Sequence, residues 1–221
     1  MKLSRTLAVL ATAAALTIGL AACTTATGGG AGNPSPSSTA AGAGYGATAS
    51  WASPLTTPGT LVTTVTGTNF KVDIFQVGTA VASKAGQFLD PQTGKPIISA
   101  GDKIVYVNYV FTNTGTTTIS LGNDLAGVEP RYADWPFLQG MDSVADADQA
   151  KTEKVNLSAF GPSAGSSPFE WKPGTSFSYG ENFTYESNSA ISFTVTMIPV
   201  LASGDPNVAK KQIITASSTI K

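Results

Sequence analysis

The largest group of residues that could do chemistry is a set of carboxylates in the middle of the chain. Seven of the 14 acidic residues lie between positions 124 and 153: Asp124, Glu129, Asp134, Asp142, Asp146, Asp148 and Glu153. Because Ca²⁺ takes roughly six to eight oxygen ligands, a weak calcium site at Asp142, Asp146 and Asp148 is one interpretation. The stretch "DSVADAD" lacks the glycine and the closing glutamate of an EF-hand loop, so a solvated acidic loop is the favoured interpretation.

Aromatic residues accompany these carboxylates in the stretch "RYADWPFLQGMD". Aromatic rings beside acidic side chains suit a sugar-binding platform or a protein-contact patch. The sequence therefore predicts a contact surface for a ligand or partner formed by Tyr132, Trp135, Asp142, Asp146 and Asp148. The alternative is that the aromatic rings pack in the core, which is the usual place of a tryptophan in a sandwich.

The absence of histidine narrows the possible reactions. Histidine is the usual general base near neutral pH and the commonest metal ligand, and the chain contains none. Ser-His-Asp hydrolysis and histidine-dependent metal sites are thereby excluded. We predict no catalytic residue, no cofactor and a protein that is not an enzyme. The alternatives are a hydrolase that uses carboxylates alone and a passive structural domain of the envelope.

One carboxylate falls on the apolar side of a strand. In "SFSYGENFTYE" the residues Phe177, Tyr179 and Phe183 share one parity with Glu181, while serine, asparagine and threonine occupy the other. A buried carboxylate is costly unless it is paired, and it would point to a functional role. The alternative is a bulge at Gly180 that turns Glu181 outward. A second alternating stretch follows a turn, so residues 175–198 are predicted to form an antiparallel hairpin.

The N-terminus carries an export signal. Lys2 and Arg5 precede 14 uncharged, mostly apolar residues, a run too short to cross a membrane and typical of a cleaved signal peptide. The next residues, "LAAC", resemble the lipobox of bacterial lipoproteins and contain Cys23, the single cysteine of the chain. The resemblance implies that the Cys23 thiol receives a diacylglyceryl group and that the protein binds the extracellular face of the cell membrane through this lipid anchor. The free thiol of an ordinary secreted protein is the alternative.

A segment without charge separates Cys23 from the rest of the chain. No charged residue lies between Thr24 and Phe70, and the composition is rich in Gly, Ala, Ser, Thr and Pro. We predict a signal peptide at residues 1–22, a lipidated cysteine and disordered linker at 23–59, and a folded domain at 60–221. Tyr45 and Trp51 are exceptions in the linker, where they either pack on the domain or lie free. After loss of Lys2 and Arg5 the chain has 11 basic and 14 acidic residues, which gives no indication of a nucleic-acid partner.

Alternating hydrophobicity dominates residues 60–221 and predicts an all-β, immunoglobulin-like antiparallel β-sandwich. The stretch "KIVYVNYVFTNTG" is apolar on both parities, as expected of a central strand. In residues 70–77 the apolar positions change parity at Phe75, which implies a β-bulge.

Two blocks, "KIVYVNYVFTNTGTTTISL" and "FEWKPGTSFSYGENFTYESNSAISFTV", resemble the immunoglobulin-like, telokin-like domains of small, actinobacterial-type surface lipoproteins. The resemblance covers residues 68–198 and implies a surface location and a non-enzymatic module of unknown ligand. An envelope protein or a cell-wall glycan is the expected partner.

Overall fold

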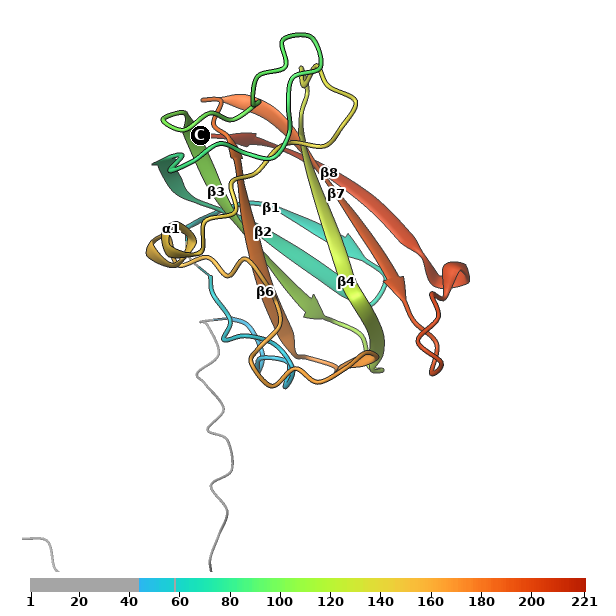
Figure 1. Cartoon of the computed structure of the whole chain (residues 1–221). Coiled ribbons are helices and arrows are strands. Elements are labelled where there is room, and N and C mark those ends of the chain that lie inside the picture. The colour runs from blue at the N-terminus through green and yellow to red at the C-terminus, as the bar shows by residue number, and fades with distance from the viewer. Residues whose placement is uncertain (1–43, 58) are drawn as a thin grey trace, which may run out of the picture. The chain divides into compact units, whose positions relative to one another are not determined.

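The computed structural model describes residues 44–57 and 59–221, which fold into two antiparallel four-stranded sheets packed face to face (Figure 1). The first sheet contains, in spatial order, β1 (Thr60–Gly67), β2 (Phe70–Val81), β3 (Lys103–Asn113) and β6 (Ser176–Thr184). The second contains β5 (Phe169–Trp171), β4 (Ile119–Tyr132), β7 (Ser189–Pro199) and β8 (Gln212–Ile220). The helix α1 (Ala147–Thr152) and the short 3₁₀ helix η1 (Val208–Lys210) lie outside the sheets. The predicted β-sandwich is confirmed.

The main core fills the space between the sheets. It consists of the inward-facing residues of the strands, which alternate with partly exposed ones along β7 as the period of two requires. Its aliphatic and aromatic members include Val72, Ile74, Val107, Tyr109, Phe111, Trp171, Phe177, Phe193, Val195 and Met197. Stacked and edge-to-face rings, among them Phe111 on Phe177 with centroids 4.6 Å apart, join the two layers.

A second, smaller cluster covers the outer face of the first sheet. Ile104 and Tyr106 of β3 point away from the main core and pack against Ile98, Val144 and Ala150 from the connections on that side. The predicted central position of this strand is confirmed, since β3 lies between β2 and β6 and almost every residue of it is buried. The apolar pattern on both parities thus reflects burial on both faces.

The chain crosses between the sheets at three places, from β3 to β4, from β5 to β6 and from β6 to β7. The prediction of a hairpin at residues 175–198 is therefore wrong, because β6 pairs with β3 while β7 pairs with β4 and β8. Both strands bury one face against the same core. Their apolar and polar residues therefore alternate as they would in the two strands of a hairpin. The turn between Thr184 and Ser189 nevertheless carries the chain across the sandwich.

Residues 44–57, which we call the strap, lie against the first sheet. Ala49 donates from its backbone N to the Ser176 carbonyl at 2.8 Å, and Ser176 donates to the Ala47 carbonyl at 2.9 Å. The strap thereby covers the free edge of β6, and an exposed strand edge is a site of aggregation. Of the two alternatives for Tyr45 and Trp51, packing on the domain is confirmed: Trp51 is 5% exposed, and Tyr45 donates to Asp73 at 2.9 Å. This part of the predicted linker belongs structurally with the folded domain.

Among the described residues, no helix is long and apolar enough to cross a membrane. The predicted signal peptide, Cys23 and the linker up to residue 43 lie outside the described residues.

Candidate functional site

The structure places two of the five predicted contact residues in the interior. Tyr132 is 1% exposed, and its hydroxyl donates to the Thr184 carbonyl at 2.9 Å and accepts from the Glu186 backbone N at 3.2 Å. Asp142 is 2% exposed, and its Oδ1 accepts from the backbone N atoms of Gln87 at 3.0 Å and Ser143 at 2.8 Å. Both side chains are buried and fix the chain path, so neither can meet a partner at the surface, although Asp142 Oδ2 makes no hydrogen bond to the described residues.

The other three predicted contact residues do not form one surface with them. Asp146 is the N-cap of α1 and accepts from the backbone N atoms of Asp148 and Gln149, each at 3.0 Å. Asp148 is exposed in the first turn of that helix, where a carboxylate complements the helix dipole. Trp135 is half-buried and donates to the Gln139 carbonyl at 3.0 Å. Within residues 44–57 and 59–221 no group of three acidic residues converges as a metal site would require, so the three aspartates do not assemble a calcium site.

Asp142 should be a stability residue. Replacing it with alanine leaves two partly buried backbone N–H groups without this acceptor, and we expect the free energy of unfolding to fall by about 2 kcal/mol. The exposed Asp148→Ala variant, measured in the same chemical denaturation series, should change it by less than about 0.5 kcal/mol. Equal effects for the two variants would contradict the structural role of Asp142.

Glu181 lies on the inner face of β6, so the outward-turning alternative is wrong. Its half-buried side chain accepts a 2.6 Å hydrogen bond from the Tyr109 hydroxyl, and Val107 of the core is its cross-strand neighbour. Burial raises the pKa of Glu181 to about 7, although the Tyr109 hydrogen bond acts in the opposite direction. The Tyr179 hydroxyl nearby is engaged with the β4 backbone, accepting from Val128 N at 3.1 Å and donating to the Ala126 carbonyl at 3.0 Å. A carboxylate between two engaged tyrosines serves packing between the sheets.

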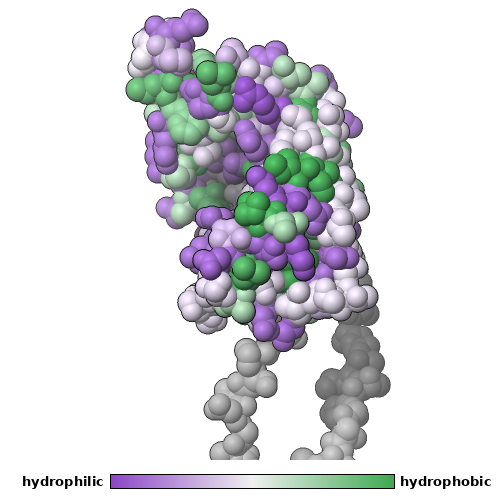
Figure 2. All heavy atoms as spheres, turned by 90° about the vertical axis from the view of Figure 1, so that its right-hand side faces the viewer, coloured by the Kyte–Doolittle hydropathy of each residue, from purple (hydrophilic) through white to green (hydrophobic). Residues whose placement is uncertain are grey.

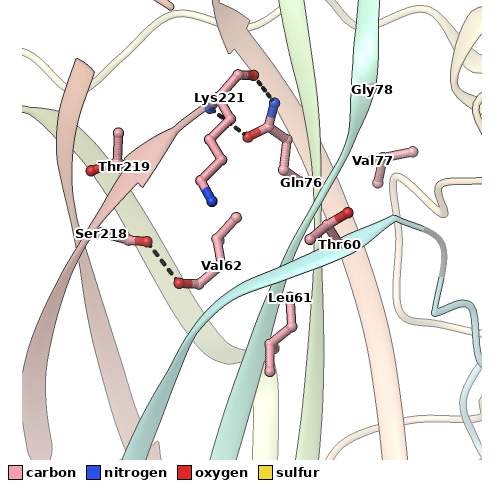
Figure 3. Close-up of a pocket in the computed structure, with 9 residues that line it drawn as sticks. All are labelled: Thr60, Leu61, Val62, Gln76, Val77, Gly78, Ser218, Thr219 and Lys221. Carbon is pink, nitrogen blue, oxygen red and sulfur yellow. Dashed lines mark hydrogen bonds between the residues drawn. The ribbon is translucent and has the colours of Figure 1, made fainter. Parts of the chain in front are cut away.

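A groove opens where the free edges of the two sheets meet, at the start of β1 and the end of β8 (Figure 3). We call it the seam groove. It has a volume of about 420 Å³. Its walls come from three strands, β1, β2 and β8, and comprise Thr60, Leu61, Val62, Gln76, Val77, Gly78, Ser218, Thr219 and Lys221. Both sheets therefore contribute to one site at the edge of the sandwich.

Two β-bulges shape the seam groove. The register between β1 and β2 shifts at Val62, and the register between β2 and β3 shifts at Val77, and both extra residues line the groove. A bulge bends its strand and is common beside functional sites. Gly59 lets the chain enter β1 here: it has φ 93°, and a Cβ would lie 2.1 Å from the Gln76 carbonyl oxygen. The predicted bulge in residues 70–77 is confirmed, and it was the one sequence signal near this site.

Polar contacts hold the two edges together. The side-chain amide of Gln76 accepts from the Lys221 backbone N at 2.9 Å and donates to the Lys221 carbonyl, as a neighbouring strand would do. Ser218 donates to the Val62 carbonyl at 2.7 Å. Figure 3 shows the Lys221 side chain extending into the groove toward Val62. Among the described residues no acidic side chain lines the groove, which offers an ammonium group beside apolar walls.

This arrangement can bind a ligand, and no nucleophile with a base lies in it. Its hydroxyl groups belong to Thr60, Ser218 and Thr219, and the chain has no histidine to activate them. On the face seen in Figure 2, hydrophobic residues form separate patches among hydrophilic ones. Single exposed apolar residues of this kind are ordinary on soluble proteins.

The chain matches no family model, and no curated protein matches its sequence. Its structure is similar to that of ycdA, a provisionally assigned lipoprotein of Bacillus subtilis subsp. subtilis str. 168, at 12% identity and a TM-score of 0.38. That match covers 71% of this chain and 38% of the Bacillus chain. A functionally unknown protein from Listeria monocytogenes EGD-e is similar at 12% identity and a TM-score of 0.36, covering 74% of this chain and 85% of that one. At these TM-scores the account of the molecule rests on its own residues.

Proposed function

We propose that this protein is an extracellular lipoprotein, anchored through Cys23, whose β-sandwich is a non-enzymatic binding module with its ligand in the seam groove. The observation that carries the proposal is the coincidence of two bulges, an unpaired ammonium group and apolar side chains in one cavity formed by both sheets. Each bulge interrupts the regular hydrogen bonding of its strand pair. Bulges are common beside functional sites, so two of them at one groove favour a ligand site there.

The lining favours an acidic, apolar segment of an envelope protein over the other partners considered. Leu61 is 52% exposed beside Val62 and Val77, and offers contact area that water now covers. Lys221 supplies a positive charge with no acidic side chain in the lining to neutralise it. β1 and β8 are edge strands of the two sheets, and an extended peptide can bind such an edge by adding a strand to it.

Thermal unfolding with a ligand panel tests the binding site. The panel comprises acidic apolar peptides, uncharged apolar peptides, cell-wall sugars, Ca²⁺ and EDTA. An acidic apolar peptide at about 100 times its Kd adds about 2.7 kcal/mol, which should raise the midpoint by about 5–10 °C for a chain of this size. The other members should leave the midpoint within about 1 °C.

Matched variants show where the ligand binds. Lys221→Ala and Leu61→Ser should abolish the shift, whereas Ile213→Ser should retain it, because Ile213 is also exposed on β8 but does not line the groove. A shift that survives in the groove variants, or a panel without any shift, would overturn the assignment of the groove.

The anchor is tested separately by Cys23→Ser. This variant should appear in the culture medium, while the unchanged protein should sediment with membranes. Equal membrane association of both would contradict lipidation at Cys23.

A further inference from the structure

A second groove lies at the opposite end of the sheet edges, about 20–25 Å from the seam groove along β1. We call it the end groove. It has a volume of about 500 Å³ and lies between the β1–β2 turn, the β3–β4 connection and the segment that joins β7 to β8. Thr68 and Gln212 tie two of these segments together, since the Thr68 backbone N donates to Gln212 Oε1 at 2.7 Å. Three separate loops thus meet around one cavity.

The lining of the end groove is rich in polar groups that the protein leaves unused. The residues in question carry hydroxyl or amide groups and are Thr68, Asn69, Thr117, Thr118 and Asn207. In the described part of the chain their side chains make no hydrogen bond to other protein groups, whereas Gln212 beside them is engaged at both ends of its amide. Hydroxyl and amide groups both donate and accept, which suits a ligand with many hydroxyl groups.

The charge of the end groove is purely positive. Lys210 and Lys211 line it, and within residues 44–57 and 59–221 no acidic side chain does. Among the residues that the structure describes, the one ion pair joins Lys71 to Asp73 and leaves these two lysines out. The protein as a whole is slightly acidic, so the two ammonium groups form a local exception. A lysine ammonium binds phosphate or carboxylate as a point charge.

The other residues that line the end groove favour one class of polyanion, an anionic glycan, over nucleic acids and acidic peptides. Ile119, Pro199 and Val200 are half-buried in the groove and provide apolar contact for the C–H faces of sugar rings. In the part of the chain that the structure describes no aromatic residue lines the groove, whereas single-stranded nucleic acids bind through base stacking on aromatic rings. An acidic peptide would use the lysines and offers one backbone donor and one acceptor per residue, whereas each sugar ring presents several hydroxyl groups to the threonine and asparagine side chains.

From this combination we infer that the end groove binds an anionic glycan, a sugar chain that carries phosphate or carboxylate groups. The two lysines bind the acidic groups, the threonine and asparagine side chains bind sugar hydroxyls, and the apolar residues support the rings. This inference goes beyond the proposed function and is independent of it, because the two grooves share no residue.

The full chain should be tested for binding to four defined polymers by fluorescence polarisation. Phosphomannan and polygalacturonate carry phosphate and carboxylate groups on sugars, mannan is the neutral analogue, and polyglutamate is an anion without sugars. We expect at least one anionic glycan to bind at least tenfold more tightly than both mannan and polyglutamate, and the stronger of the two identifies the acidic group. Its affinity should fall as the salt concentration rises.

The variant K210A/K211A should weaken glycan binding at least tenfold and leave the unfolding midpoint unchanged, because both lysines are exposed. K84A/K95A removes the same number of charges from exposed positions outside both grooves and should bind like the unchanged chain. Three results would each overturn the inference: no binding of either anionic glycan, equal binding of mannan or polyglutamate, or full binding by K210A/K211A.

Discussion

Replacing Trp51 with alanine should lower the free energy of unfolding by about 3–5 kcal/mol. The indole packs against three aromatic rings of the core, with centroid distances of 6.0 Å to Phe160, 5.4 Å to Phe169 and 5.1 Å to Phe177. Its Nε1 also donates to the Glu170 carbonyl at 3.0 Å. For a domain of this size, thermal denaturation followed by circular dichroism should show a midpoint about 10 °C lower or more.

Tyr45 supplies the control for this prediction. Tyr45→Phe keeps the ring against Phe75 and removes only the hydroxyl that donates to Asp73, so it should cost about 1 kcal/mol. Asp73 retains Thr64 at 2.6 Å and Lys71 at 2.6 Å, and these hydrogen bonds outweigh burial and keep its pKa below the usual value. If Trp51→Ala were no more destabilising than Tyr45→Phe, the strap would not be part of the folded domain.

The strap also defines which fragment folds. A chain that starts at residue 44 retains Trp51 and the hydrogen bonds to Ser176, whereas one that starts at residue 60 loses both. The longer fragment should melt cooperatively at the midpoint of the full chain, and the shorter one at a clearly lower temperature. This experiment locates the start of the folded domain, which the composition of the linker did not predict correctly.

Glu181 should make the protein less stable as the pH rises through neutrality. The folded protein holds the pKa of this carboxyl at about 7, above the ordinary 4.5, because burial disfavours the charged form. The folded state therefore binds the proton more tightly than the unfolded state. The resulting stabilisation is complete below pH 4.5 and is lost as the pH rises toward and through 7, and it amounts to about 3 kcal/mol. The chain has no histidine, so few other groups titrate between pH 5 and 8.

Glu181→Gln isolates this contribution. Glutamine keeps the shape and an acceptor for the Tyr109 hydroxyl but carries no charge at any pH. In urea unfolding series the variant should match the unchanged protein at pH 4 and exceed it by about 2–3 kcal/mol at pH 8. Glu186→Gln is the control, since burial and Asp134 raise the pKa of that group as well, but less strongly. A pH dependence that persists in Glu181→Gln would contradict the assignment.

Local patterns predicted several features of the fold and one feature of the site. A bulge lies within residues 70–77, as predicted, but at Val77, after the parity change at Phe75, whose ring lies outside the main core against Tyr45. The double-sided burial of β3 was visible because both parities of that stretch are apolar. The seam groove as a whole was not visible, because Lys221 and Val62 are far apart in the sequence and nothing local records that β8 ends beside β1.

The predicted contact surface shows the opposite case. Asp142 and Asp148 have the same side chain and lie six positions apart, yet one is buried and the other is exposed. The difference arises because Asp142 meets the backbone of Gln87, a contact of the tertiary structure. Composition predicts that acidic residues lie at the surface. It does not predict which single acidic residue is buried and hydrogen-bonded instead.

The sequence by itself determined that this is a β-sandwich protein without histidine chemistry, because alternation along a strand records directly which side chains are buried. The tertiary structure alone decided which strands pair, that residues 175–198 cross between sheets, that the strap closes the edge of β6, and where the two grooves open. The physical reason is that a strand with one apolar face is equally satisfied by a hairpin partner or by an opposite sheet, so the choice depends on contacts distant in the chain.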